Sequence, residues 1–188
     1  MIRATLDDKE GIITQLVRSF DDNRSVNYII TQGANRSCCI KALMAYAFDM
    51  CYHYGEVFFS DDRKASALVL FPEKRKTDLR TVWLSIRLVI RSIGWKNVPK
   101  VKKREAVIKK TQPSTLLYYL WFIGVEPEHQ GNGIGTLLLK EVIERAKQMN
   151  RVICLETSTL KNLPWYKKYG FEIYAKKDLE YPLYFLKQ

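Results

Sequence analysis

The stretch that ends in a cluster of three glycines constrains the fold more than any other part of this chain. An apolar, aromatic run from Leu116 to Val125 has the composition of a buried strand. From Thr136 onwards, apolar residues recur at helical spacing, and the turn between the two segments contains Gly131, Gly133 and Gly135. Unpaired N–H groups converge where a helix begins, and the helix dipole adds partial positive charge there. The sequence therefore predicts an anion site whose glycines let the backbone approach a diphosphate closely.

Three kinds of glycine-rich loop follow a strand in this way: a dinucleotide site, a P-loop and an acyl-CoA loop. The dinucleotide fingerprint needs G-x-G-x-x-G within a βαβ unit, whereas the order here is Gly131-x-Gly133-x-Gly135. A P-loop needs Gly-Lys-Ser/Thr, and Thr136 follows Gly135 without a lysine. An acyl-CoA loop therefore fits best, and a turn that only caps the following helix is the structural alternative.

A second motif lies downstream of this loop. The strand-like segment Cys154-Leu155-Glu156-Thr157-Ser158 is followed by Asn162-Leu163-Pro164-Trp165-Tyr166 and by Gly170-Phe171. Together with Gln130-x-x-Gly133-x-Gly135, the Tyr-x-x-x-Gly-Phe signature resembles the GCN5-related N-acetyltransferase (GNAT) superfamily. The form of the second motif is similar to the puromycin N-acetyltransferase-like branch. The clear resemblance covers about residues 115–175, and Asn162 lies closer to Tyr166 than the asparagine of many members does.

The resemblance implies an α/β fold with a mixed, mostly antiparallel seven-stranded sheet, flanked by helices and splayed at its centre around acetyl-CoA. It implies acetyl-CoA as a cosubstrate and no metal. The expected cofactor-binding residues are Ile123, Gly124, Val125, Gln130, Gly131, Asn132, Gly133, Ile134, Gly135, Thr136 and Asn162. We expect N–H groups of Ile123 to Val125 to serve the acetyl end, those of the loop to hold the pyrophosphate, and Gln130 to order the loop. Gly124 suggests a bulge that splays its strand.

The implied activity is transfer of an acetyl group to a primary amine by direct attack in a ternary complex. The amine must lose a proton, and the departing thiolate must gain one. By resemblance, Tyr166 is the general acid, and Glu156 is the candidate base, acting directly or through a water. The alternatives are a core tyrosine and a glutamate that only accepts backbone hydrogen bonds. A non-catalytic acyl-CoA sensor or basic interaction module on the same fold is the other functional hypothesis, although Tyr166 and Glu156 together favour an enzyme.

Composition agrees with one domain over residues 1–188. The chain is 47% hydrophobic and 27% charged, as in an ordinary globular protein. We see no export signal and no apolar stretch long enough to span a bilayer, so we expect a cytoplasmic protein without a membrane partner. The four cysteines show neither the spacing of a disulfide framework nor that of a metal site, so we expect them to be reduced thiols. They are Cys38, Cys39, Cys51 and Cys154. The expected partner is an amine-bearing small molecule or peptide, and the expected assembly is a monomer or homodimer.

Hydrophobic periodicity and turn residues predict an order of elements. Strands are expected over residues 2–5, 56–60 and 65–71, and helices over about 6–20, 26–31, 35–50 and 77–93.

The segment 74–110 is strongly basic. It contains thirteen Lys or Arg residues and two acids, so its net charge equals the +11 of the whole chain. An insertion of two solvated amphipathic helices, with residues such as Val82, Leu84, Ile86, Leu88, Val89 and Ile90 partly buried, explains this charge most simply. Steering of an acidic acceptor is a second hypothesis, and nucleic-acid binding is a third, disfavoured because no recognition motif accompanies the charge.

Overall fold

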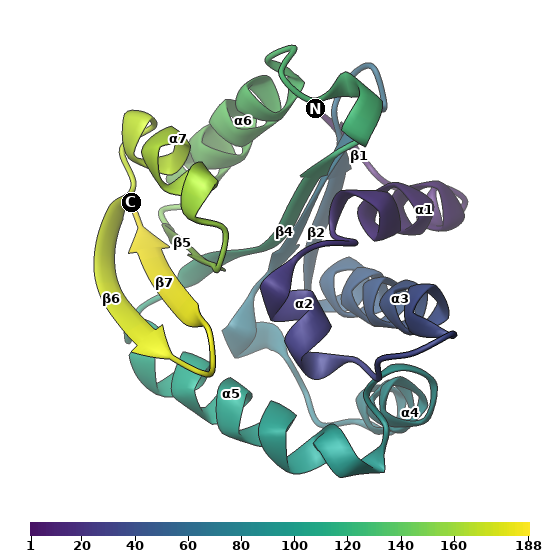
Figure 1. Cartoon of the computed structure of the whole chain (residues 1–188). Coiled ribbons are helices and arrows are strands. Elements are labelled where there is room, and N and C mark those ends of the chain that lie inside the picture. The colour runs from purple at the N-terminus through teal and green to yellow at the C-terminus, as the bar shows by residue number, and fades with distance from the viewer.

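A seven-stranded sheet forms the centre of the computed structural model, which describes residues 1–188 (Figure 1). The strand order is β1-β2-β3-β4-β5-β7-β6, and every neighbouring pair is antiparallel except β4 and β5. The strands are β1 (Ile2–Arg3), β2 (Gly55–Phe59), β3 (Ala65–Leu70), β4 (Leu117–Val125), β5 (Val152–Thr157), β6 (Glu172–Asp178) and β7 (Pro182–Lys187). The predicted fold class is confirmed.

Helices cover both faces of the sheet. They are α1 (Lys9–Ser19), α2 (Arg24–Ile29), α3 (Arg36–Tyr54), α4 (Leu79–Leu88), α5 (Val98–Thr111), α6 (Ile134–Gln148) and α7 (Leu163–Lys168). The helices α1, α2 and α3 pack on one face, where Tyr119 and Phe122 of β4 join their core. The helices α6 and α7 pack on the other face against Tyr118 and Leu120 (Figure 1). Alternation along β4 thus supplies both cores from one strand.

Most predicted elements form, with shifted boundaries. The α1 helix begins at Lys9 rather than Leu6, because the Asp8 carboxylate accepts hydrogen bonds from the N–H and the hydroxyl of Thr5 in the turn before it. The α3 helix continues to Tyr54, and α4 ends at Leu88 in a wider π-helical turn, Val89–Ile93. None of the helices combines the length and the apolar character needed to cross a bilayer.

The central strands β4 and β5 separate after a short pairing. Their parallel ladder joins Leu117 to Val152 and ends where Tyr119 meets Cys154. Beyond that point the two strands diverge, as expected for a splayed sheet.

The predicted bulge at Gly124 is wrong. Gly124 pairs regularly with Ser66 of β3, and the register shift lies at Trp121 instead, between the pairs that Leu120 and Phe122 make. Gly124 is required for another reason: a Cβ there would lie 3.0 Å from a methyl group of Leu16 and 3.1 Å from Ser19. The glycine therefore allows α1 to cross β4 at close range, since no side chain stands between them.

The basic segment forms α4, the π-helical turn and α5, which together enclose one end of the molecule (Figure 1). The prediction of partial burial holds for Leu84, Leu88 and Val89. It is wrong for Val82, Ile86 and Ile90, which are exposed.

Candidate active site

The glycine loop presents a row of free backbone donors. Gly131 and Gly133 adopt φ values of 82° and 79°, in the left-handed region that favours glycine, and α6 begins at Ile134. None of the hydrogen bonds within the chain uses the six N–H groups from Gly131 to Thr136. These donors lie at the positive end of the α6 dipole, which suits a diphosphate.

This loop borders a cavity of about 510 Å³. The cavity is lined by ten of the eleven expected cofactor residues: Ile123, Gly124, Val125, Gln130, Gly131, Gly133, Ile134, Gly135, Thr136 and Asn162. Asn132 does not line it. Residues of α1 and of the segment after it also line the cavity, among them Ser19, Phe20 and Asn23. No sequence pattern predicts this contribution, because these residues come from a distant part of the chain.

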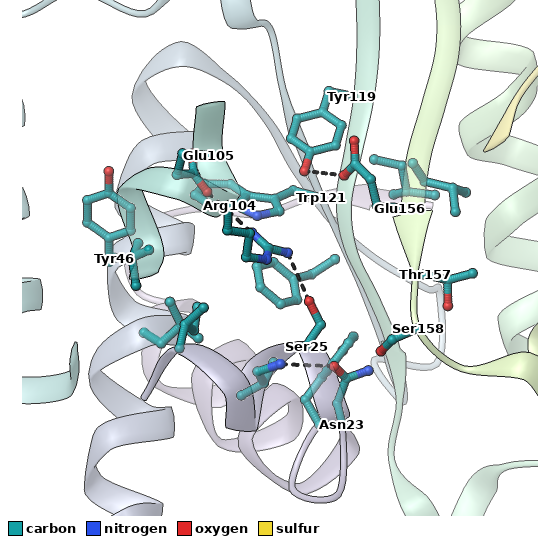
Figure 2. Close-up of a pocket in the computed structure, with 18 of the residues that line it drawn as sticks. Asn23, Ser25, Tyr46, Arg104, Glu105, Tyr119, Trp121, Glu156, Thr157 and Ser158 are labelled. Carbon is teal, nitrogen blue, oxygen red and sulfur yellow. Dashed lines mark hydrogen bonds and ion pairs between the residues drawn. The ribbon is translucent and has the colours of Figure 1, made fainter. Parts of the chain in front are cut away.

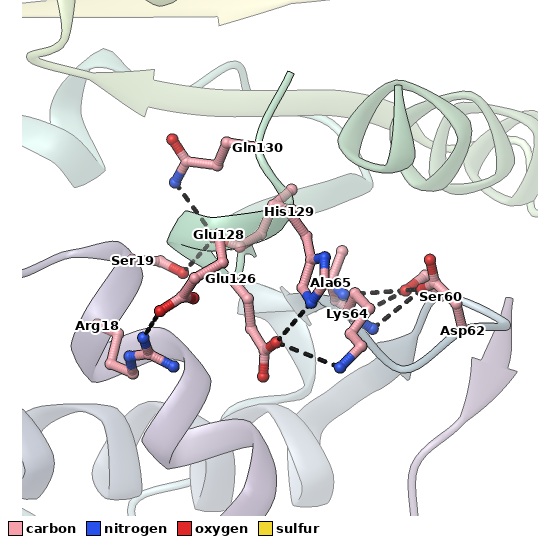
Figure 3. A network of polar contacts seen from close by, with 11 residues as sticks. Arg18, Ser19, Ser60, Asp62, Lys64, Ala65, Glu126, Glu128, His129 and Gln130 are labelled. Atoms are coloured by element: carbon pink, nitrogen blue, oxygen red, sulfur yellow. Dashed lines mark hydrogen bonds and ion pairs between the residues drawn. The ribbon is translucent and has the colours of Figure 1, made fainter. Parts of the chain in front are cut away.

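Side chains fix the loop in place. Gln130 Nε2 donates to the carbonyl of Val125 at 3.2 Å, and Ser19 Oγ donates to the same carbonyl at 2.8 Å. Figure 3 shows this contact beside an ion pair that joins Glu128 of the loop to Arg18 of α1. On the α7 side, Trp165 Nε1 donates to Thr136 Oγ1 at 3.0 Å.

Strand β4 presents free polar groups toward the splayed gap. Glu126 N–H donates to the carbonyl of Lys64, and hydrogen-bonded pairs alternate in an antiparallel ladder. Gly124 is therefore bonded to β3, whereas the N–H groups of Ile123 and Val125 point toward β5. Two of the three expected donors face the gap, and Gly124 contributes only its small size.

A second cavity, of about 360 Å³, opens on the other side of the gap. Aromatic residues from α3, β4, α7 and the position just after α1 line it: Phe20, Tyr46, Tyr119, Trp121, Phe122 and Tyr166. The inner faces of α4 and α5 and the turns between them close it, so the basic segment is a wall of this cavity. Both cavities share five residues: Phe20, Asn23, Ile123, Thr159 and Asn162.

Glu156 projects into this second cavity from β5 (Figure 2). Tyr119 donates its hydroxyl proton to Glu156 Oε2 at 2.6 Å, and Gln112 Nε2 donates to Oε1 at 3.3 Å. Loss of solvation raises the pKa of Glu156 to about 7, although these hydrogen bonds and the charge of Arg104 act in the opposite direction. A carboxylate with this pKa can both accept and release a proton near neutral pH.

Tyr166 lies in α7 at the border of the second cavity. Its ring packs against Phe171, with the ring centroids 5.5 Å apart, and belongs to the α6 core. Burial raises the pKa of its phenol well above the ordinary value, so the hydroxyl keeps its proton at neutral pH. No other side chain or backbone group of the chain accepts that proton.

Comparison with known proteins finds a family match in the second half of the chain. Residues 101–173, which include the glycine loop, Glu156 and Tyr166, match the family described as "Acetyltransferase (GNAT) domain". This part of the chain is similar to a GNAT acetyltransferase domain. The match does not reach the puromycin N-acetyltransferase-like branch specifically.

Solved structures share the GNAT fold over the whole chain. One is a protein from Corynebacterium glutamicum that is described as "histone acetyltransferase HPA2 and related acetyltransferase". It aligns with a TM-score of 0.74 and 21% sequence identity, and the alignment covers 99% of this chain and 93% of that one. The C-terminal condensation domain of Ebony aligns with a TM-score of 0.69 and 10% sequence identity, and the alignment covers 100% of this chain and 96% of that one. An N-acetyltransferase from Staphylococcus aureus Mu50 aligns with a TM-score of 0.60 and 16% sequence identity, and the alignment covers 100% of this chain and 98% of that one.

A polar cluster that sequence reasoning missed faces Glu156 across the second cavity (Figure 2). Buried Arg104 of α5 donates to Ser25 Oγ at 2.9 Å and to the Tyr181 hydroxyl at 3.1 Å, and pairs with Glu105 at 3.3 Å. Arg104 was hidden in the sequence among twelve other basic residues of the segment 74–110, with no pattern to distinguish it.

Proposed function

We propose that this domain transfers the acetyl group of acetyl-CoA to a primary amine by direct attack in a ternary complex. The observation that supports this most strongly is the pair of cavities that meet at Ile123, Thr159 and Asn162. Free backbone donors line one cavity, and an ionisable carboxylate with a raised pKa lies in the other. A thioester and an amine that entered from opposite sides would meet in the splayed gap.

The donor side suits acetyl-CoA. The pyrophosphate would accept hydrogen bonds from the N–H groups of Gly131 to Thr136, and the pantetheine would run along the free edge of β4. The N–H groups of Ile123 and Val125 are available to the amide and thioester oxygens there. One of them would stabilise the oxyanion of the tetrahedral intermediate.

Glu156 is the proposed base. The attacking nitrogen needs its lone pair, so an ammonium acceptor must first lose a proton to Glu156, directly or through a water. The hydrogen bonds from Tyr119 and Gln112 hold the carboxylate in place and leave it further lone pairs. These hydrogen bonds orient the Glu156 carboxylate both for direct proton transfer and for transfer through a water.

Tyr166 is the proposed acid. It keeps its proton at neutral pH, and its hydroxyl is not used within the fold, so it is available to the departing CoA thiolate. The C–N bond forms first and gives the tetrahedral intermediate. When the intermediate collapses, the C–S bond breaks and the sulfur takes the phenolic proton.

A covalent acetyl-enzyme is disfavoured. Cys154, the thiol on β5 near the gap, is completely buried, and burial raises the pKa of this thiol far above the ordinary value. The thiolate is the nucleophilic form, and it is therefore scarce at this position.

The second cavity favours a small acceptor with an apolar or aromatic body. Its volume and aromatic walls suit a compact amine, whose charged end would lie at Glu156. A peptide would have to enter by its N-terminal residue alone.

The test is a panel of primary amines, from aliphatic to aromatic, incubated with acetyl-CoA. Free CoA and acetylated amine should appear in equal amounts, as measured by thiol detection and mass spectrometry. If acetyl-CoA binds but no amine, peptide or protein acceptor is acetylated, the chain is an acyl-CoA sensor on the same fold, and the proposed activity is wrong.

A further inference from the structure

Helix α4 turns an apolar stripe to the solvent. Leu79, Trp83 and Ile90 are 90%, 58% and 64% exposed, and Val82 and Ile86 are also exposed. Spacings of three and four residues place all five on one side of the helix. The opposite side, with Thr81 and Leu84, is the buried one. We call the five residues and the exposed Trp95 just beyond the helix the α4 face.

Basic side chains border the α4 face. Arg80, Arg87 and Arg91 follow one edge of the stripe, and Lys96 lies beside Trp95; all four are exposed. None of them takes part in the salt bridges of the chain. The guanidinium of Arg87 lies over the ring of Trp83, 5.4 Å from its centroid.

Asp78, just before α4, offsets only part of this charge. Asp78 caps α4 by accepting a hydrogen bond from the N–H of Thr81, and it also accepts one from the Tyr54 hydroxyl. The α4 face is therefore both apolar and positively charged, a combination that solvated surfaces rarely show over a continuous stripe.

We propose that the α4 face docks on the surface of an anionic lipid bilayer. Interfacial helices combine Trp, Leu and Ile on one side with Arg or Lys beside them, and lie in the plane of the headgroups. Anionic headgroups attract the basic residues, and the apolar stripe enters the boundary of the acyl chains. The position of α4 at the outer margin of the molecule leaves this face open to a flat surface (Figure 1).

Other occupants fit less well. A second copy of the chain, placed by a two-fold axis on this face, would bring two rows of arginine together, and juxtaposed like charges oppose association. Nucleic acid would satisfy the charge but leave the leucine, isoleucine and valine side chains without apolar partners. The proposal departs from the sequence-based expectation of no membrane partner.

Docking here would bear on the second cavity. The other side of the same segment, with Ser85, Leu88, Val89 and Ile93, lines that cavity. A bilayer on the α4 face would therefore lie directly outside the helix that covers the proposed acceptor site. The docking itself does not depend on the proposed reaction.

Co-sedimentation of the full chain with vesicles tests the proposal. Wild type should bind vesicles that contain phosphatidylglycerol and phosphatidylcholine, and bind phosphatidylcholine alone far more weakly. Two triple variants should each lose most of the binding: Trp83→Ser/Ile86→Ser/Ile90→Ser and Arg80→Glu/Arg87→Glu/Arg91→Glu. From the electrostatic contribution of basic residues near an anionic surface, we expect the charge variant to bind at least about 100-fold more weakly.

A matched variant controls for total charge. Lys140→Glu/Lys147→Glu/Lys177→Glu makes the same charge change on exposed residues of α6 and β6, away from the α4 face, and it should bind like wild type. Equal loss in this control would show a nonspecific charge effect and overturn the proposal. The proposal would also be overturned if wild type did not bind the vesicles. A third contradicting result would be a concentration-dependent dimer that forms in wild type and is lost only in the serine variant, because the α4 face would then be a dimer interface.

Tryptophan fluorescence provides a measurement that does not rely on the triple variants. Because Trp83 and Trp95 are exposed, their emission should shift to shorter wavelength on anionic vesicles, and brominated lipids should quench it. Trp83→Phe/Trp95→Phe keeps both apolar rings, so this variant should still sediment with the vesicles while most of the spectral shift disappears. An unchanged wild-type spectrum would contradict insertion of the stripe.

Discussion

Glu156 is the residue on which the proposed chemistry most depends. Its side chain lies in a cavity with aromatic walls, within hydrogen-bond distance of Tyr119 and Gln112. Tyr119 of β4 and Gln112 at the end of α5 lie 37 and 44 residues before this carboxylate of β5 in the sequence, and the fold brings the three together. Desolvation has the largest effect on its pKa, which rises to about 7. The same burial that makes the carboxylate a useful base makes its ionised form costly to the fold.

The pH dependence of kcat/KM should reveal this group. With an acceptor whose amine titrates well outside the range, kcat/KM should rise with pH through about 7, because the base must be ionised. Glu156→Gln should lower kcat/KM by about 10²–10⁴-fold and remove the inflection. A variant that retained full activity would reduce Glu156 to a structural hydrogen-bond acceptor.

The same substitution should change stability in the opposite direction. Because the pKa is raised from 4.5 to about 7, the stability linked to the protonated form is present below about pH 4.5 and lost as the pH rises through about 7. Glutamine does not ionise and still accepts the Tyr119 hydroxyl proton. Thermal unfolding should therefore show a higher Tm for Glu156→Gln than for wild type above about pH 7, with the gain shrinking toward about pH 4.5. A lower Tm at every pH would contradict this account.

Tyr166→Phe should separate catalysis from binding. The substitution keeps the packed ring and deletes a hydroxyl that has no partner in the chain. We therefore expect kcat to fall by about 10²–10⁴-fold, while the affinity for acetyl-CoA and the Tm stay unchanged. Tyr169→Phe is the matched control. The Tyr169 hydroxyl makes no hydrogen bond within the chain, and the residue lines neither cavity, so activity should be unchanged. Equal activity in both variants would assign Tyr166 to packing.

At the scale of elements, the strand β4, the glycine loop and α6 form the proposed anion site. The left-handed φ values of Gly131 and Gly133 turn six N–H groups away from the fold. A Cβ on Gly135 would lie only 2.9 Å from a methyl group of Val125, so α6 starts close to the strand that delivers the loop.

Gly133→Glu should abolish acetyl-CoA binding measured by calorimetry. The new carboxylate would enter the site of the pyrophosphate and repel it. Gly33→Glu makes the same change at another glycine with a left-handed φ, 121°, and open space around its Cβ position. Both variants should lose stability through backbone strain, about 1–2 kcal/mol each, but only the first should lose binding. Retained affinity in Gly133→Glu would remove the loop from the cofactor site.

The sequence predicts the strand, the glycine turn and the helix because this information is local. A strand, a glycine pattern and a helical period lie within one short stretch, so spacing alone indicates a turn with free backbone donors. Their contact with a cofactor stays a prediction. Gly124 illustrates the limit. A glycine within a strand permits either a bulge or the close approach of another element, and only the position of α1 decides between them.

The α4 helix illustrates a second limit of the same kind. Its apolar period is visible in the sequence, and such a stripe normally faces the core. The structure places the stripe outward. The opposite side packs against the core through Leu84 and Leu88 and borders the second cavity through Ser85 and Leu88.

At the scale of the whole molecule, charge and cavities are arranged around one end of the sheet. The basic segment 74–110 carries a net charge equal to that of the chain. It supplies Arg75, Lys102 and Arg104 to the wall of the second cavity and other basic residues to the α4 face. Steering of an acidic acceptor by this segment stays a prediction. If steering occurs, the charge-reversed variant Lys102→Glu/Lys103→Glu should have a higher KM for the acceptor than wild type. This difference in KM should decrease as the salt concentration increases.

Acetyl-CoA should stabilise the fold as a whole, because its site joins α1, the glycine loop and α7. At about 100 times its Kd, a ligand that binds only the folded state adds about 2.7 kcal/mol, or roughly 5–11 °C in Tm for a chain of this size. Gly133→Glu should show no shift. An equal shift in that variant would place the cofactor elsewhere.

Acetyl transfer by wild type and Glu156→Gln, followed from about pH 6 to about pH 9 with one confirmed amine, tests the central claim most directly. Both proteins should bind acetyl-CoA equally in calorimetry. Wild type should form acetylated amine and free CoA in equal amounts, with initial velocities that intersect when both substrates are varied, and with the inflection near pH 7. Glu156→Gln should lose the inflection and most of the rate. Parallel velocity patterns with an acetylated protein, or an unchanged profile in the variant, would contradict direct transfer assisted by Glu156.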